Sequence, residues 1–330
     1  MASDNNTPPF LILPDLAAAR VGGRAIATND DFFASKANLV KDDPAIFIPG
    51  KYTPRGKWMD GWESRRRRTP GHDWCVVALG MRGRIAGVNL DTHYFTGNFP
   101  SHASIESIDT TKAIKRKDYG VEGLPWTPLL AKVELGGDRD NFFAVDNVRP
   151  WTHLRLNIFP DGGVARLRVH GEVEVDWRRV APRGRAVDLA SVEHGGIVLE
   201  VSDMHYGAKG NMLMPGRARN MGDGWETRRR RGPGFDWAVI RLGHAGMVSK
   251  IEIDTNHFKG NYPDSASIEG RLARSEEWRV LLPQTRLKPH HRHFFSKQLQ
   301  RVGAISHVRL NIFPDGGVSR LRVHGTLATS

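Results

Sequence analysis

The sequence DGWESRRRRTPGHDW at residues 60–74 returns as DGWETRRRRGPGFDW at residues 223–237. The match extends without a gap to residues 106 and 269, and 26 of the 47 aligned positions are identical. The offset of 163 residues is the size of a whole domain and far exceeds the period of a solenoid repeat. The sequence therefore predicts a tandem pair of related domains.

A second block fixes the extent of each copy. HLRLNIFPDGGVARLRVHG at 153–171 returns at 307–325 with 17 of 19 positions identical. The basic, Pro- and Gly-bearing segment WRRVAPRGRAVD separates the copies and is typical of a linker. The predicted organisation is an N-terminal lead-in at 1–16, repeat 1 at 17–176, a linker at 177–188 and repeat 2 at 189–330.

The spacing of apolar residues within each copy predicts β-strands. Arg166 and Arg168 alternate with Leu167 and Val169, which is the period of two of a half-buried strand. Turn sequences such as PDGG separate runs of this kind, and convincing helical periodicity is almost absent. The fold class predicted is all-β, with each repeat a mostly antiparallel β-sandwich of jelly-roll type.

Composition limits the function classes. The chain has 330 residues, 39% of them hydrophobic, and its longest apolar runs, such as residues 10–13, are far below the roughly 20 residues of a membrane span. The N-terminus has no basic region followed by an apolar stretch, and Cys75 is the single cysteine, so neither a secretory signal nor a disulfide framework is predicted. We therefore expect a cytoplasmic protein without a membrane partner.

The formal net charge of +12 raises the question of a nucleic-acid partner. The two RRRR runs, at 65–68 and 228–231, lie inside apolar, Gly- and Pro-punctuated blocks rather than in a low-complexity tail. No nucleic-acid partner is therefore predicted.

The arginine runs allow two interpretations. If the runs are extended, alternate guanidinium groups face opposite sides, and one face needs carboxylates such as Glu63 and Asp73 as ion-pair partners. The other face could hold a substrate carboxylate in a bidentate arginine fork, for which we select Arg66 and Arg229. Both interpretations can hold, one for each face.

Acidic and amide side chains around the repeated blocks suit a polar binding site. Asx-type turn bonding is the alternative for those in the loops. The side chains selected for substrate binding are Asp60, Asp223, Asn98, Asn261 and Asp91.

The loop after Asp91 and Asp254 differs between the copies. Repeat 1 has DTHYFTGN and repeat 2 has DTNHFKGN, so His257 aligns with Tyr94. The HHRH stretch at 290–293 is interpreted as a solvated loop without a counterpart in repeat 1, and no metal ligand set is predicted.

The DGWExxRRR and DTxxFxGNxP motifs occur in both halves, together with NIFPDGG-x-x-RLRVHG and the SDxHYG of 202–207. In this combination the chain resembles the allantoicase (allantoate amidinohydrolase) family from about residue 22 to 328. The resemblance implies two jelly-roll-like, galactose-binding-like domains. It also implies hydrolysis of allantoate to ureidoglycolate and urea in purine catabolism by a homo-oligomer. The enzyme class implied is a hydrolase of carbon–nitrogen bonds in linear amidines.

Allantoate carries one carboxylate and two ureido groups on one carbon, so its site needs a guanidinium, hydrogen-bond acceptors and a proton donor. For the proton donor we select His257 with Glu226 or Asp254, because DTxHF in repeat 2 matches the family's pattern. No cofactor is predicted, and activation by a divalent metal ion cannot be read from the sequence. The alternative function is a non-catalytic jelly-roll protein that binds a ligand or carbohydrate.

Overall fold

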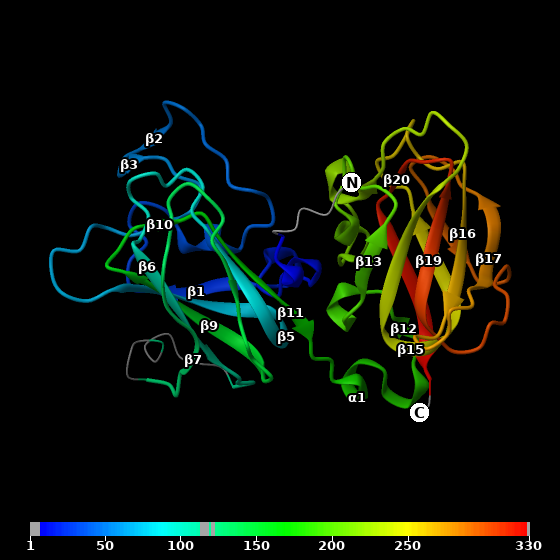
Figure 1. The fold of residues 1–330 in the computed structure, drawn as a ribbon, viewed down its shortest axis with the longest axis horizontal. Helices are drawn as coiled ribbons and strands as arrows, with labels where there is room; N and C mark the ends of the chain where they lie inside the picture. Colours follow the sequence, from blue (N-terminus) through cyan, green and yellow to red (C-terminus); the bar gives the residue numbers. More distant parts are fainter. Residues whose placement is uncertain (1–6, 113–118, 120–122, 329–330) are drawn as a thin grey trace. The chain divides into compact units, whose positions relative to one another are not determined.

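The computed structural model describes residues 7–112, 119 and 123–328. The chain divides into two compact units, Met1–Glu174 and Val175–Ser330, called unit 1 and unit 2 below (Figure 1). Both units are built from strands with a few single-turn helices, which confirms the all-β class and the duplication. Within the described residues, no helix is long and apolar enough to cross a membrane.

Unit 1 is organised around one long strand, β5 (Asp73–Asp91). The main sheet has the order β1-β5-β9-β6-β7, with β11 and β8 also paired to β5, and every pairing is antiparallel. The other main strands are β1 (Arg24–Thr28), β6 (His102–Ile108), β7 (Thr127–Glu134), β8 (Phe142–Ala144), β9 (Pro150–Phe159) and β11 (Arg166–Val173). The short elements are β2 (Tyr52–Thr53), β3 (Gly56–Lys57), β4 (Trp62–Glu63), β10 (Gly163–Val164), η1 (Pro9–Ile12), η2 (Ala19–Val21) and η3 (Lys36–Val40).

Unit 2 repeats this arrangement around β15 (Asp236–Asp254). Its sheet has the order β12-β21-β15-β19-β16-β17, with β13 and β18 also paired to β15. The strands are β12 (Val187–Asp188), β13 (Ile197–Val201), β14 (Trp225–Glu226), β16 (Ser265–Arg271), β17 (Arg279–Arg286), β18 (Arg292–Phe295), β19 (Ile305–Phe313), β20 (Gly317–Val318) and β21 (Arg320–Leu327). The helices are α1 (Trp177–Val180), η5 (Pro182–Gly184), η6 (Val192–His194), η7 (Lys209–Leu213) and η8 (Met221–Asp223), of which α1 and η5 lie in the predicted linker.

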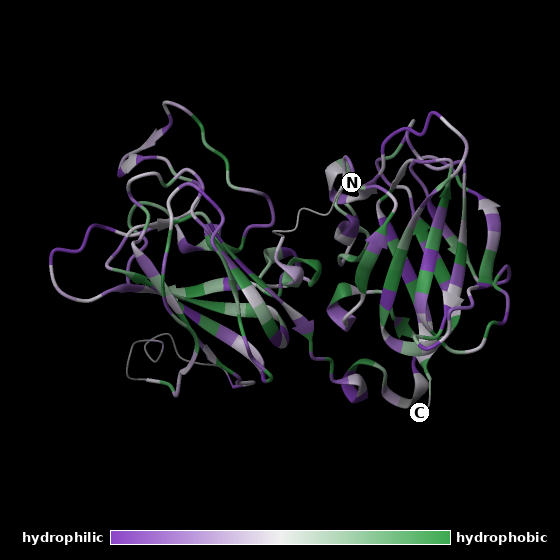
Figure 2. Cartoon of the chain, in the orientation of Figure 1, coloured by the Kyte–Doolittle hydropathy of each residue, from purple (hydrophilic) through white to green (hydrophobic). Residues whose placement is uncertain are grey.

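The core of each unit comes from the alternating faces of these strands. Leu154, Leu156 and Ile158 of β9 are fully buried, and Figure 2 shows hydrophobic and hydrophilic residues alternating along β16 and β19. The tryptophan of each DGWE motif is also fully buried, and its indole N–H donates to a backbone carbonyl, from Trp62 to Asp30 (2.7 Å) and from Trp225 to Asp203 (2.8 Å). These bonds satisfy the one polar atom of each buried ring.

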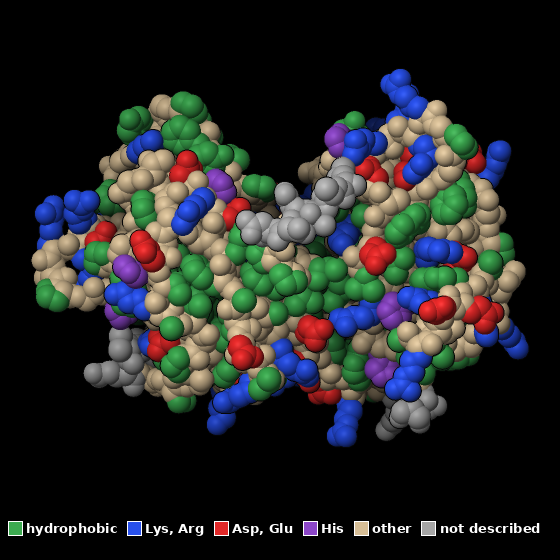
Figure 3. Space-filling view, in the orientation of Figure 1, with side chains coloured by type: hydrophobic (Ala, Val, Ile, Leu, Met, Phe, Trp, Pro, Cys, Tyr) green, Lys and Arg blue, Asp and Glu red, His purple; other side chains and the backbone are tan. Residues whose placement is uncertain are grey.

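The face drawn in Figure 3 has no single patch of charged side chains. Lys and Arg side chains are spread over both units among acidic ones. Many cations of the chain are paired with acidic side chains, as in the bonds of Arg82 to Asp109 and of Arg84 to Glu174. On this face the positive charge is therefore distributed along the strands and loops.

The second glycine of PDGG packs directly against a buried ring in both units. A Cβ atom on Gly317 would lie 2.0 Å from the ring of Phe258, and one on Gly163 would lie 1.9 Å from the ring of Phe95. Both rings are buried, with 0% and 1% of their surface exposed. Only glycine lets β20 and β10 approach these rings.

We expect Gly317→Ala to lower the free energy of unfolding by about 1–3 kcal/mol, because the added methyl group must displace the buried Phe258 ring. Gly260→Ala is the control, because a Cβ at that position meets no atom within 4 Å. Urea denaturation measures both variants. A Gly317→Ala protein as stable as the control would contradict this packing argument.

Candidate functional site

The arginine run of unit 1 lies just after β4 and separates into two pairs. Arg65 bonds Asp30 (2.6 Å), and Arg67 bonds the buried Asp73 (2.7 Å). Arg66 and Arg68 are exposed and have no ion-pair or hydrogen-bond partner among the described residues. The predicted alternation of faces is present, although the run itself is not part of a strand.

The run of unit 2 has the same arrangement. Arg228 pairs with Asp203 (3.4 Å) and Arg230 with Asp236, while Arg229 and Arg231 are exposed. The carboxylate of Asp315 in the PDGG turn accepts from the backbone N–H of Arg230 at 2.7 Å. The ion-pair interpretation therefore describes alternate arginines of each run, and the remaining arginines have no ion-pair partner within the described part of the chain.

A pocket of about 470 Å³ lies beside the arginine run of unit 1. Glu63 lies at its wall, and Asn98 donates a hydrogen bond to the Glu63 carboxylate (2.7 Å). Arg66 and Arg67 also line the pocket, as does Gly162 of the PDGG turn. The pocket thus combines a carboxyl group, an amide and an unpaired guanidinium, all from the duplicated blocks.

Burial raises the pKa of Glu63 above its ordinary value, although the hydrogen bond from Asn98 and the charge of Lys57 act in the opposite direction. Burial has this effect because removal from water disfavours the charged carboxylate. A carboxyl group with a raised pKa keeps its proton to higher pH and can donate it to a reacting group. The sequence predicted Glu63 as an ion-pair partner of the arginine run, but its carboxylate accepts a hydrogen bond from Asn98 instead.

The same pair recurs in unit 2, where Asn261 bonds the carboxylate of Glu226. Glu226 is buried in β14, with 9% of its surface exposed. Among the described residues, Glu226 makes no hydrogen bond or ion pair with His257 or Asp254. The selection of His257 with Glu226 or Asp254 predicted a contact that the structure does not place at Glu226, whose carboxylate accepts from Asn261 instead.

Asp60 and Asp223 lie in buried ion pairs. Asp60 bonds Arg166 (2.7 Å) and Lys41 (2.7 Å), and Asp223 bonds Arg320 (3.1 Å). Arg166 also donates to the backbone carbonyls of Asp43, Pro44, Asp60 and Ala165. Both carboxylates, which were selected for substrate binding, are thus engaged with the protein's own arginines.

The loop after β15 has a positive φ at His257 (71°), and the equivalent Tyr94 has 69°. The backbone N–H of His257 donates to Nδ1 of His290, and that of Tyr94 donates to Asp138, each at 2.8 Å. Such a backbone costs about 1–3 kcal/mol in a residue other than glycine. Both copies hold this turn with a side chain that accepts from the same backbone N–H.

His257 binds through its ring to the backbone. Its Nε2 lies 2.9 Å from the carbonyl oxygen of Ala218, which Asn256 also reaches at 3.2 Å. Asp254 is fully buried and accepts from the backbone of Asn256 (2.9 Å) and from Arg217 (3.3 Å). His257 therefore lies near Asp254 in the chain but contacts Ala218 and His290.

The HHRH stretch has a counterpart in unit 1, contrary to the prediction. The N–H of Thr255 donates to the carbonyl of His291 (3.0 Å), as that of Thr92 does to Arg139 (2.9 Å). Residues 138–141 therefore correspond to 290–293. His293 is also buried, so the stretch is only partly solvated, because β18 begins inside it and pairs with β15.

The fold and these polar clusters define a tandem all-β protein that repeats one set of buried ion pairs in two units. The allantoicase repeat model matches residues 14–174 and 187–328. The chain is 50% identical to a probable allantoicase of Pseudomonas paraeruginosa over 96% of this chain and 97% of the relative, and 47% identical to probable allantoicase 1 of Burkholderia mallei over 98% of both. It also matches the crystal structure of allantoicase from Saccharomyces cerevisiae, with a TM-score of 0.82, 34% identity and coverage of 94% and 92% of the two chains. The chain belongs to the allantoicase family.

We expect Asp60→Asn to destabilise unit 1 by about 3–5 kcal/mol, because the change leaves the buried Arg166 guanidinium without its carboxylate. Urea denaturation at pH 7 measures the loss. Glu277→Gln, which breaks an exposed pair with Arg279, should leave stability unchanged and serves as the control.

The pH dependence of the stability lost in Asp60→Asn follows from the pKa of Asp60. Burial alone would raise this pKa, but the hydrogen bonds from Lys41 and Arg166 outweigh it and lower the pKa below its ordinary value. A lowered pKa stabilises the fold above the unfolded pKa of about 3.9, and this contribution is lost as the pH falls through the folded-state pKa. The difference in free energy of unfolding between the wild type and Asp60→Asn should therefore shrink as the pH falls into the acid range. A difference that grows there would contradict the ionised pair.

Proposed function

We propose that this chain is an allantoicase, a hydrolase that cleaves a carbon–nitrogen bond of allantoate to give ureidoglycolate and urea. The full-length similarity to allantoicases supports the reaction. The observation that carries the proposal to the site is the pocket of unit 1, where the unpaired Arg66 lies with the Glu63–Asn98 pair.

Each group of the substrate has a partner of suitable chemistry in this pocket. The exposed Arg66 binds the carboxylate of allantoate in a charge-assisted, bidentate contact. The side-chain oxygen of Asn98 accepts from a ureido N–H, since its amide nitrogen is already directed at Glu63. These contacts leave the carboxyl group of Glu63 facing the ligand.

Proton transfer completes the proposed reaction. The Cα–N bond breaks, the proton of Glu63 goes to the leaving urea nitrogen, and a water oxygen bonds to the carbon. One proton of that water then returns to the Glu63 carboxylate, so the group ends as it began. The raised pKa of Glu63 keeps the donor form present at higher pH than an exposed glutamate would.

Unit 2 carries a second proposed proton donor, His257, with Glu226 or Asp254 as the carboxylate that assists it. Its unpaired Arg229 corresponds to Arg66, and Asn261 corresponds to Asn98. An imidazole has one ring nitrogen that can donate a proton and one that can accept it, so it suits proton transfer. Single variants in the two units distinguish the donors.

We further propose a homo-oligomer in the cytoplasm, as the family resemblance implies. Light scattering of the purified protein should give a mass above that of one chain. A concentration-independent mass of one chain would contradict the oligomer.

We expect Arg66→Ala to raise KM for allantoate about 10- to 100-fold, because one charge-assisted contact is worth roughly 1.5–3 kcal/mol. Arg68→Ala removes an equally exposed guanidinium outside the pocket lining and is the matched control. Steady-state kinetics with urea as the measured product gives both values, and Arg229→Ala applies the same test to unit 2. If Arg66→Ala and Arg68→Ala have the same KM, Arg66 does not hold the carboxylate.

We expect Glu63→Gln to lower kcat about 10²- to 10⁴-fold, because the amide keeps the shape of the side chain but has no acidic proton. In the wild type, kcat should fall at alkaline pH as Glu63 loses its proton. This alkaline fall should be absent from the pH profile of Glu63→Gln. Glu134→Gln, an exposed change in the same unit, is the control. Wild-type turnover in Glu63→Gln together with a collapse in Glu226→Gln would move the donor to unit 2.

If His257 of unit 2 is the donor instead of Glu63, His257→Asn lowers kcat at least about a hundredfold, while Tyr94→Phe and Glu63→Gln change it little. Circular dichroism checks that the histidine variant stays folded. Near-normal turnover in a folded His257→Asn protein would remove histidine from the mechanism.

A further inference from the structure

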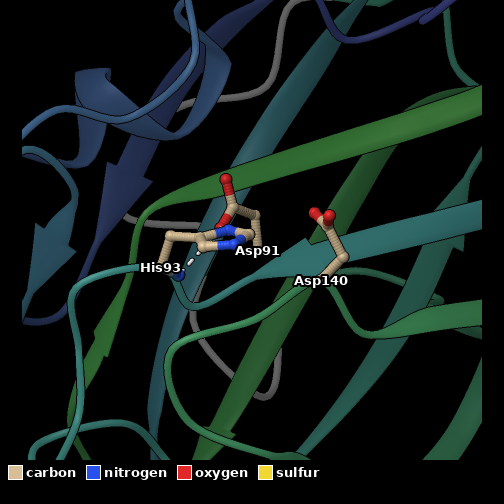
Figure 4. Close-up of side chains that lie close together, drawn as sticks. All are labelled: Asp91, His93 and Asp140. Atoms are coloured by element: carbon tan, nitrogen blue, oxygen red, sulfur yellow. Dashed lines mark hydrogen bonds and ion pairs between the residues drawn. The ribbon is translucent and has the colours of Figure 1, made fainter.

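Three potential metal ligands meet at the end of β5 in unit 1. Asp91 ends the strand, His93 follows it by two residues, and Asp140 lies in the segment before β8 (Figure 4). One ligand atom from each lies within 4.8 Å of the others. Nδ1 of His93 is 2.8 Å from a carboxylate oxygen of Asp91, and Asn89 donates to Asp140 at 2.6 Å.

Burial differs across this cluster. Asp91 is buried, with 8% of its surface exposed, whereas Asp140 is exposed and His93 is half-buried. The cluster therefore has a buried carboxylate at its base and an opening to solvent. A buried carboxylate is costly unless positive charge or hydrogen bonds compensate it.

Unit 2 provides an internal comparison for the same position. The correspondence of 138–141 with 290–293 places Arg292 where unit 1 has Asp140, and the aligned blocks place Asn256 where unit 1 has His93. Arg292 forms a two-bond pair with Glu252, the counterpart of Asn89, at 2.7 and 3.0 Å. The charge of Asp254 also helps to raise the pKa of Arg292, after the larger effect of the bond to Glu252.

The charge balance of the two positions is therefore different. In unit 2 the carboxylates of Glu252 and Asp254 face the guanidinium groups of Arg292 and Arg217. In unit 1 the carboxylates of Asp91 and Asp140 have no Lys or Arg partner among the described residues. Two negative charges thus lie together where the second copy has two negative and two positive charges.

We propose that unit 1 binds one divalent first-row transition-metal ion between Asp91, His93 and Asp140, at the position that Arg292 neutralises in unit 2. A charge of +2 balances the two carboxylates. An imidazole nitrogen beside carboxylate oxygens favours a transition-metal ion over Mg²⁺ or Ca²⁺, which prefer oxygen ligands alone. Three protein ligands leave positions open for water.

Metal binding rearranges one hydrogen bond in this cluster. His93 binds the ion through Nδ1 as a neutral imidazole. The contact between Nδ1 and the Asp91 carboxylate is then replaced by the bonds of both groups to the ion. The backbone N–H of His93 still donates to Asp91 at 2.8 Å and keeps the loop in place. The same loop continues to Gly97 and Asn98 of the pocket, so the ion fixes the start of a segment whose end reaches Glu63.

Calorimetric titration of the full, chelator-treated chain with ZnCl₂ tests the site directly. The wild type should bind one equivalent that His93→Asn and Asp140→Asn bind at least about 10- to 100-fold more weakly. His102→Asn makes the same change at a histidine outside the cluster, and this variant should still bind one equivalent of zinc as tightly as the wild type. MgCl₂ should not compete at equal concentration. The proposal would be overturned if both cluster variants bound zinc as tightly as the wild type. It would also be overturned if the wild type bound no saturable equivalent of zinc.

Asp140→Arg gives a second readout that does not depend on activity. This change introduces the residue of unit 2 at an exposed position, so folding should be preserved. The metal-free variant should unfold at a temperature equal to or above that of the wild type, and ZnCl₂ should raise the unfolding temperature of the wild type alone. An equal zinc-induced rise in both proteins would contradict the site.

Discussion

The buried guanidinium of Arg166, and its counterpart Arg320, is the constraint on which each unit depends. Arg166 is 1% exposed and binds Asp60 together with four backbone carbonyls. A charge so deeply removed from water is tolerated only when its hydrogen-bonding capacity is satisfied, and this one joins the DGWE block to β11. The same bonds position β4 and therefore Glu63, which lies three residues beyond Asp60. The two most faithfully repeated segments of the sequence are thus the two halves of one buried interaction.

Strands were the part of the fold that the sequence predicted well. The alternation of Arg166 and Arg168 with Leu167 and Val169 correctly indicated β11, because the apolar residues face the core. The pattern could not indicate that Arg166 is also buried, since that depends on residues 43–46 covering the other face. Two apolar stretches, 73–80 and 84–91, form the single strand β5, whose pairing with β9 shifts between Ala78 and Gly83. Local periodicity does not report such a continuation across a register shift.

The polar site was predictable only where both partners lie in the duplicated blocks. Alternation within RRRR distinguished the free Arg66 from the paired Arg67, because extended backbone directs successive side chains to opposite sides. Glu63 and Asn98 lie 35 residues apart in one duplicated block, and their spacing alone does not fix the hydrogen bond between them. Asp140 was missed because it lies in a segment with no detectable sequence counterpart, and it reaches Asp91 only through the pairing of β8 with β5.

The late position of β11 in the chain has a consequence for biosynthesis. The strand spans Arg166–Val173 and supplies the guanidinium that neutralises Asp60, more than 100 residues earlier. A nascent chain that has not yet released these residues from the ribosome leaves Asp60 without Arg166 and the second half of β5 without β11. Long-range pairing of this kind delays folding until the final contact is available. Each unit should therefore close only when its last strand emerges, so an emerging chain exposes an unpaired strand edge that chaperones can shield.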